Sequence, residues 1–188
     1  MKLSSNKMIV GLALLAGFAL ALAGPVYTRI TRAPPAKVSF LNPHIGVSEQ
    51  IGPEQLAELH ERGFTTIIDL RPDGEAVGQA PSSVMAAVAD ENRMTFVYVP
   101  VPHGDIPDSA VAALDKALLP GRGKVLLYCR SGRRAARTWG LVEASRAGGL
   151  DGRAILTAIR ASGQSADDLS EAIAQRIAHR KSIAEALK

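Results

Sequence analysis

The single cysteine of this chain lies in a short segment that could hold a nucleophile beside an anion. Cys129 follows the apolar run VLLY, and Arg134 closes the segment CRSGRR with four residues between the two. A cysteine thiolate is a strong nucleophile, and an arginine guanidinium can hold two oxygens of a bound oxyanion. The residue types and their spacing therefore predict covalent chemistry on an anionic substrate, with Cys129 and Arg134 as catalytic residues.

The elements on either side of this segment would shape it into a loop. Residues 125–128 are typical of a buried strand, and residues 135–147 are typical of a helix that ends before Gly148 and Gly149. A loop curled around a helix N-terminus directs its backbone N–H groups inward, and the helix dipole favours thiolate over thiol. The anion-binding residues predicted in this loop are Arg130, Ser131, Gly132 and Arg133.

A buried, inert cysteine with solvated arginines on the next helix is the alternative interpretation, because cysteine is often buried without reacting. The concentration of arginine around Cys129, together with the order strand, cysteine, glycine, helix, favours the catalytic one. Because Cys129 is the only cysteine, the chain can form no internal disulfide and no metal site built from several cysteines, and its four histidines are scattered along the sequence. We therefore expect neither a metal nor a cofactor.

Strand and helix patterns alternate through the rest of the chain. Such an order predicts an α/β domain with a largely parallel sheet covered by helices on both faces. Strands are expected at 64–70, 95–101 and 125–128, a strand or hairpin at 38–47, and helices at 53–62, 82–91, 109–118, 135–147, 151–161 and 166–187. We assign the catalytic domain to residues 38–165 and a C-terminal helix to residues 166–188.

The N-terminus is typical of a membrane-directed segment. Residues 8–28 hold no charged side chain, and Lys2 and Lys7 precede them. Residues 1–28 are therefore expected to be a transmembrane anchor, or a signal peptide cleaved after Ala23. Residues 29–37, with Pro34 and Pro35, read as a linker. Either interpretation most simply predicts an exported domain, tethered to the membrane or secreted, although basic residues flank both sides of the segment and leave its orientation open.

The net charge of +4 does not describe the folded body. Five of the 22 basic residues, and none of the 18 acidic ones, lie in residues 1–37, so the remaining chain is close to neutral. Aromatic residues make up only 4% of the chain, and the arginines gather around the cysteine. Binding of nucleic acid is therefore not expected, and the predicted partner is a small anionic substrate.

Several stretches resemble known families. CRSGRR is similar to the active loop of rhodanese-type sulfurtransferases. The stretches VSEQIGPEQLAELHERGFTTIIDLRPDGE, VYVPVPHGDI, YCRSGRR and ASGQSADDLS resemble the phosphatase-like domain of beta-lactamase hydrolase-like proteins. The resemblance implies a three-layer fold like that of the dual-specificity protein tyrosine phosphatases, and members of that family have been described both as phosphatase-like and as sulfurtransferase-like.

For a phosphatase the resemblance also implies a general acid in the loop HGDIPD. Asp105 is the first candidate, although a solvated loop aspartate is nearly as good an interpretation. Asp108 is the reserve, and its better interpretation is the N-cap of the next helix. His103 in the same loop, and Arg71 after the strand at 64–70, are candidates for the pocket wall. A turn-stabilising ion pair of Arg71 with Asp73 or Glu75 is equally plausible.

Three departures from the phosphatase pattern favour sulfur transfer instead. The usual pattern has five residues between cysteine and arginine where this chain has four, Ala135 stands where a hydroxyl residue is usual, and Tyr128 replaces a customary histidine. The family resemblance and the candidate acid Asp105 favour a phosphatase, and on that basis we expect hydrolysis of a phosphate ester through a cysteinyl-phosphate. The alternatives are a sulfurtransferase that carries a persulfide on Cys129, and a non-catalytic module that binds an oxyanion.

Overall fold

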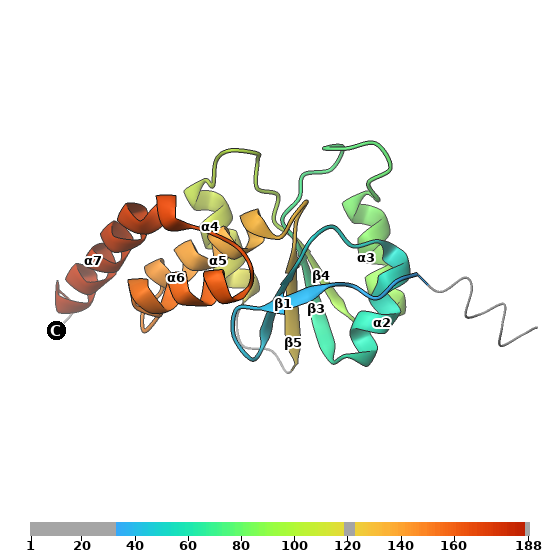
Figure 1. The fold of residues 1–188 in the computed structure, drawn as a ribbon, viewed down its shortest axis with the longest axis horizontal. Coiled ribbons are helices and arrows are strands. Elements are labelled where there is room, and N and C mark those ends of the chain that lie inside the picture. Colours follow the sequence, from blue (N-terminus) through green and yellow to red (C-terminus); the bar gives the residue numbers. More distant parts are fainter. Residues whose placement is uncertain (1–32, 119–122, 187–188) are drawn as a thin grey trace, which may run out of the picture. The chain divides into compact units, whose positions relative to one another are not determined.

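Figure 1 shows a computed structural model that describes residues 33–118 and 123–186. The described residues from Pro35 onward form one compact unit. In chain order the elements are β1 (Val38–Phe40), β2 (Ile45–Ser48), a 3₁₀ turn (Pro53–Gln55), α2 (Leu56–Glu61), β3 (Phe64–Asp69), α3 (Ser82–Glu91), β4 (Thr95–Tyr98), α4 (Asp108–Ala117), β5 (Lys124–Tyr128), α5 (Arg133–Ser145), α6 (Gly152–Ala161), a second 3₁₀ turn (Asp167–Leu169) and α7 (Ser170–Ala186).

The five strands form one sheet in the order β1-β2-β5-β3-β4. Only β1 runs antiparallel to its neighbour, so the expected α/β class with a largely parallel sheet is confirmed. Tyr128 at the end of β5 pairs in register with Ser48 of β2 and Asp69 of β3, and Asp69 pairs with Tyr98 of β4. The carboxyl ends of four strands therefore meet at one edge, where parallel sheets place their ligands.

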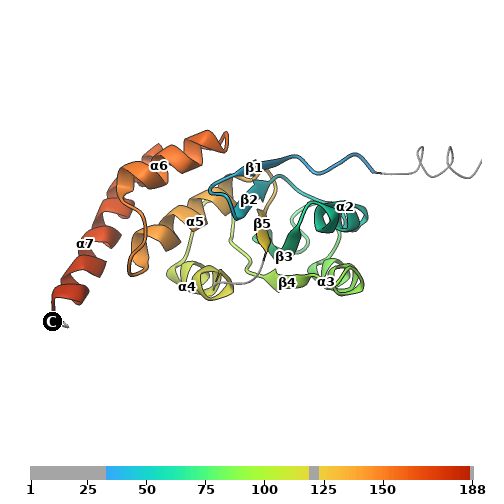
Figure 2. The same cartoon turned by 90° about the horizontal axis from the view of Figure 1, so that it is seen from below.

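Helices cover both faces of this sheet, which gives three layers (Figure 2). Side chains along β3 alternate between the faces, as the strand geometry requires. Ile67 packs in the core beneath α2 and α3, whereas Ile68 packs in the core beneath α4 and α5. α6 and α7 lie outside α5, and Ile173 of α7 is buried against the same core. The loop between β5 and α5, which contains Cys129, is thus held between the central strand and a helix that is buried on several sides.

Several boundaries differ from the sequence prediction by a few residues, and helix α5, for example, begins at Arg133 before the predicted residue 135. Two of the differences fall in the segment between β4 and α4. The strand β4 ends at Tyr98, before the predicted residue 101. Val99 and Val101 still donate to the carbonyls of Asp69 and Leu70, but the N–H of Arg71 donates to the Asp69 side chain, so the regular ladder does not continue. Helix α4 begins at Asp108 itself, with Pro107 as the capping residue. The prediction that Asp108 caps this helix was therefore wrong, and its carboxylate forms an ion pair with Arg176 of α7.

Within residues 33–118 and 123–186, no helix combines the length and the apolar character that a membrane crossing requires. The hydrophobic segment predicted as an anchor or signal peptide lies outside the described residues. That assignment stays a prediction.

Candidate active site

The loop after β5 turns sharply into α5 at Gly132. Gly132 has a φ of +82°, a left-handed conformation that side chains other than glycine adopt at a cost. A Cβ at this position would lie 3.2 Å from the carbonyl oxygen of Ser48 and 3.1 Å from Nε2 of Gln164. The backbone conformation therefore favours glycine here, and a side chain would also require Ser48 or Gln164 to shift by a few tenths of an ångström.

Two hydrogen bonds from outside the loop orient its peptides. The carbonyl of Arg130 accepts a hydrogen bond from the backbone N–H of Gln50 at 3.4 Å, and the carbonyl of Ser131 accepts one from Nε2 of Gln164 at 3.1 Å. In a trans peptide the next N–H points opposite to the carbonyl. The N–H groups of Ser131 and Gly132 therefore point to the inner side of the loop, where an anion can accept from them.

Arg134 is fixed by two partners from other parts of the chain. Its Nη1 donates to the carbonyl of Val101 at 2.7 Å and lies 2.7 Å from Oε2 of Glu75. Its Nη2 donates to Oε1 of Glu75 at 2.7 Å. Glu75 follows β3 and Val101 follows β4, so both come from the loops beside Cys129 at the carboxyl edge of the sheet.

This arrangement leaves one edge of the guanidinium for a ligand. Of the five N–H donors of an arginine, three are directed at Glu75 and Val101. The Nε–H and the second Nη2–H lie along one edge, the geometry that binds two oxygens of an oxyanion. Partial burial lowers the pKa of Arg134, but the hydrogen bond to Glu75 and the interactions with Cys129 outweigh it and raise that pKa. Arg134 thus stays charged beside the cysteine.

Cys129 lies beneath the loop with only 1% of its surface exposed. Its neighbours are the apolar residues of the core on the α4 and α5 side of the sheet. Cys129 does not itself line the cavity beside the loop, and its polar neighbour is Arg134, which interacts with it. The structure thus brings together the cysteine and arginine that the sequence singled out.

Arg71 is the second partner of Glu75. Its Nε donates to Oε1 of Glu75 at 3.0 Å, and its Nη1 donates to Oε1 of Gln50 at 2.8 Å. The side chain is 6% exposed and does not line the site cavity. Arg71 and Arg134 therefore share the carboxylate of Glu75. Arg71 forms the ion pair that the sequence analysis gave as the alternative to a role in the pocket wall.

We expect Glu75→Gln to weaken both the fold and the site. Loss of the carboxylate leaves two largely buried guanidinium groups without a counter-charge, which should lower the free energy of unfolding by about 3 kcal/mol. The hydrogen bond from Arg134 is the main cause of the lowered pKa of Glu75. The stability that this carboxylate contributes is therefore fully present above its unfolded-state pKa, and it is lost as the pH falls through its folded-state pKa. Urea unfolding at pH 7.5 and pH 4 measures both effects.

Glu58→Gln is the matched control, because Glu58 forms a more exposed pair with Arg62 one helical turn away. We expect it to cost less than about 0.5 kcal/mol. Equal losses in the two variants would contradict the assigned role of Glu75.

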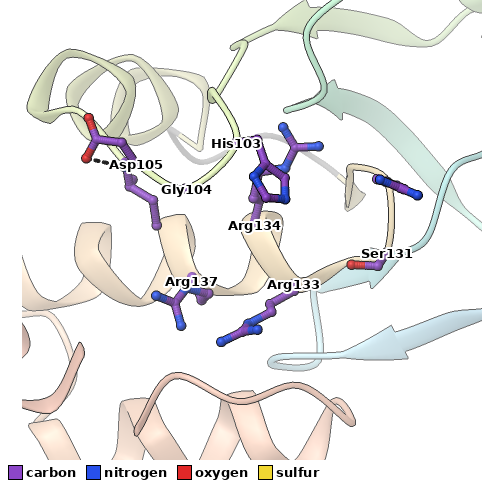
Figure 3. Close-up of a pocket in the computed structure, with 9 residues that line it drawn as sticks. His103, Gly104, Asp105, Ser131, Arg133, Arg134 and Arg137 are labelled. Atoms are coloured by element: carbon purple, nitrogen blue, oxygen red, sulfur yellow. Dashed lines mark hydrogen bonds between the residues drawn. The ribbon is translucent and has the colours of Figure 1, made fainter. Parts of the chain in front are cut away.

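The loop opens into a cavity of about 260 Å³ (Figure 3). His103 and Asp105, both predicted near the site, line it. The carboxylate of Asp105 points away from Arg134 and accepts a hydrogen bond from the backbone N–H of Ile106 at 2.8 Å. The lining residues are His103, Gly104, Asp105, Ile106, Arg130, Ser131, Arg133, Arg134 and Arg137.

A second buried carboxylate lies near the loop. Asp69 at the end of β3 is 1% exposed, and burial raises its pKa to about 6, opposed by the hydrogen bond from the Arg71 backbone N–H. The folded state therefore keeps the carboxyl proton of Asp69 up to about pH 6, whereas the unfolded state releases it near pH 4. Between these values the folded state binds more protons, so this group's contribution to stability falls as the pH rises.

We expect Asp69→Asn to remove that dependence. The amide oxygen can still accept the bond from Arg71, and no charge has to be buried. The variant should match the wild type near pH 4 and exceed it by up to about 3 kcal/mol at pH 7.5. Urea unfolding across this range measures the difference. A difference that stays constant with pH would show that Asp69 is ionised in the fold throughout.

Sequence reasoning missed several residues that hold this site. Gln50, Gln164 and Asp168 were not singled out, and Glu75 was considered only as a partner of Arg71. Two weak signals were available: Glu75 ends the stretch LRPDGE, and Gln164 and Asp168 lie in ASGQSADDLS. Within the described part of the chain, no three histidine, cysteine, aspartate or glutamate side chains gather as a metal site would need.

Comparison with known proteins places these features in a family. Residues 37–147 match the family described as "Beta-lactamase hydrolase-like protein, phosphatase-like domain". The chain is 31% identical over 117 residues to a beta-lactamase hydrolase-like protein of Xylella fastidiosa strain Temecula1, and 29% identical over 117 residues to one of Agrobacterium fabrum strain C58. Each match covers 62% of this chain and 26% of the relative, so the chain spans about a quarter of these proteins.

Solved structures agree with this assignment. A candidate phosphatase of Neisseria meningitidis Z2491 superposes with a TM-score of 0.64 at 25% identity, over 73% of this chain and 96% of that one. The kinase associated phosphatase superposes with a TM-score of 0.62 at 14% identity, over 77% and 97%, which shows the shared fold. The predicted phosphatase-like fold is thus confirmed, and the chain belongs to the phosphatase-like domain family of the beta-lactamase hydrolase-like proteins.

Proposed function

We propose that this chain hydrolyses a phosphate ester through a cysteinyl-phosphate intermediate. The supporting observation is the free edge of Arg134, held by Glu75 and Val101 beside Cys129 and the inward N–H groups of the loop. The Cys129 thiolate attacks phosphorus, the bond from phosphorus to the ester oxygen breaks, and a general acid protonates the leaving oxygen. Water then attacks phosphorus, which releases inorganic phosphate and restores the thiolate.

Asp105 is the proposed general acid. It lies on an exposed loop that also contains Gly104 with a φ of +90°, between β4 and α4. The role requires that the carboxylate leave the Ile106 N–H and turn into the cavity that Asp105 already lines. The reserve candidate, Asp108, is instead engaged by Arg176, which favours Asp105.

We expect Asp105→Asn to slow hydrolysis of an alkyl phosphate by about 100-fold, because the leaving alkoxide then departs unprotonated. A nitrophenyl phosphate, whose leaving group is a weaker base, should be slowed much less. Phosphate release from both esters measures the ratio. An equal effect on the two esters would exclude Asp105 as the acid.

Sulfur transfer is the second candidate, and the loop itself favours it. Four residues separate Cys129 from Arg134, so the loop is smaller than that of a typical phosphatase, and Ala135 offers no hydroxyl. In this reaction the thiolate takes the outer sulfur of thiosulfate and releases sulfite, and the persulfide then passes that sulfur to cyanide or to an acceptor thiol. No general acid is needed.

One pair of assays separates the two enzymes. The chain is incubated with nitrophenyl phosphate, and separately with thiosulfate and cyanide, and its intact mass is measured after each reaction. Cysteine-dependent release of phosphate supports the hydrolase. Formation of thiocyanate with one added sulfur on the protein supports the sulfurtransferase and overturns our proposal. Anion binding without either reaction would indicate a non-catalytic module.

A further inference from the structure

The site cavity holds more positive charge than one phosphate group requires. Four arginines line it, and only Arg134 is positioned on the cysteine. Asp105 is the one acidic residue among the described lining residues, and its carboxylate points away from Arg134. The loop N–H groups and the free edge of Arg134 are sufficient to bind a single phosphoryl group. The additional arginines therefore need another explanation.

Arg133 and Arg137 extend the charge along α5. They are four residues apart on one helix, so they share a face and lie about one turn, roughly 5.4 Å, apart along the axis. Both side chains point away from the Asp105 loop, toward the side of the cavity that faces the C-terminal segment (Figure 3). Arg130 at the start of the loop is exposed, and no other described residue forms an ion pair with it.

The exposed carboxylate of Asp168 already forms ion pairs with Arg133 and Arg137. Asp168 receives two hydrogen bonds from Arg137, Nη1 to Oδ1 at 2.5 Å and Nη2 to Oδ2 at 2.7 Å, and Nη2 of Arg133 lies 3.9 Å from its Oδ1. The Arg137 side chain is 14% exposed, whereas Asp168 is 58% exposed. A fixed guanidinium thus holds a two-oxygen anion that is itself open to solvent. The hydrogen bonds from Arg137 lower the pKa of Asp168 to about 2, as expected for an anion held by this fork.

We propose that Arg133 and Arg137, together with Arg130, form a second anion subsite next to the catalytic loop, and that the substrate carries at least two phosphate groups. One phosphate lies on the Cys129 loop, and the other replaces the Asp168 carboxylate on Arg137. This inference rests on the proposed hydrolysis of phosphate esters, and it names the substrate class. Asp168 then acts as an internal competitor that is displaced only by an anion of matching fork geometry.

The test is a binding titration of the full chain by calorimetry with two compounds that have no P–O–P or P–O–C bond to hydrolyse. Methylenediphosphonate offers two phosphonates, and methylphosphonate offers one. We expect the first to bind at least tenfold more tightly. Arg137→Gln should weaken methylenediphosphonate about tenfold and methylphosphonate less than twofold.

Arg153→Gln is the matched control, because it removes the same charge from an exposed position of α6 that does not line the cavity. It should leave both affinities unchanged. Asp168→Asn keeps both arginines and removes the competitor, so it should tighten methylenediphosphonate several-fold and confirm the site independently of any folding defect in Arg137→Gln.

An equal loss of affinity for both compounds in Arg137→Gln, or weaker binding of methylenediphosphonate to Asp168→Asn, would overturn the subsite. These outcomes are independent of turnover. A chain that releases phosphate through Cys129 but shows no preference for two phosphonates keeps the proposed function and loses the subsite. A chain that prefers two phosphonates without hydrolysing any ester loses the function alone.

Discussion

Cys129→Ser is expected to abolish turnover of a phosphate ester, with a loss of about 10⁴-fold or more, as for other enzymes that lose their nucleophile. A serine hydroxyl stays protonated at neutral pH, and the structure places no base beside it that could activate it among the described residues. The loop N–H groups and Arg134 remain, so the anion should still bind. Release of phosphate from nitrophenyl phosphate, together with methylphosphonate binding, measures the two effects separately.

The fold should survive this exchange, because serine is slightly smaller than cysteine and adds one buried hydroxyl. We expect a loss of about 1 kcal/mol in the free energy of unfolding. If Cys129→Ser retained the full rate while binding methylphosphonate normally, the covalent mechanism would be wrong, and so would the persulfide alternative.

Arg134→Lys is expected to have the second-largest effect, a loss of about 10²- to 10³-fold in kcat/KM. Lysine keeps the charge but has no planar fork of donors. It therefore cannot bind Glu75 and Val101, as Arg134 does, and at the same time donate two hydrogen bonds to an oxyanion. The loss should lie in kcat more than in KM, because the charge on the equatorial oxygens is redistributed in the transition state. Steady-state kinetics with nitrophenyl phosphate resolves the two parameters.

Arg160→Lys is the matched control, since Arg160 pairs with Asp167 at an exposed position of α6 outside the cavity. It should leave both parameters unchanged. Near-normal kcat in Arg134→Lys would show that charge alone is sufficient, and the argument from the free guanidinium edge would then fail.

The order of elements and the central loop were predictable because their signals are local. A continuous apolar run such as Val125–Tyr128 of β5 indicates a strand buried on both faces, and β5 is indeed the middle strand. Likewise, Gly132 between a strand and a helix indicates a tight turn, and its φ of +82° confirms that turn. Cys129 and Arg134 belong to this same short segment, so their proximity follows from the local backbone.

The residues that hold the loop were not predictable in the same way. Glu75 is 59 positions from Arg134, Gln164 is 33 positions from Ser131, and Asp168 is 31 positions from Arg137. Each lies in a turn or loop rich in polar residues, where a solvated side chain is the ordinary expectation. Only the packing of the β3 loop and the C-terminal segment against α5 brings them to the site.

The clamp of Glu75 and Val101 on Arg134 has a consequence for how a substrate binds. A free arginine side chain loses about 2 kcal/mol of rotamer entropy when it is immobilised. Here that loss accompanies folding, because Glu75 and Val101 already orient the guanidinium. An incoming anion therefore meets a side chain that needs no further ordering, and more of the interaction energy remains for stabilising the reacting phosphoryl group.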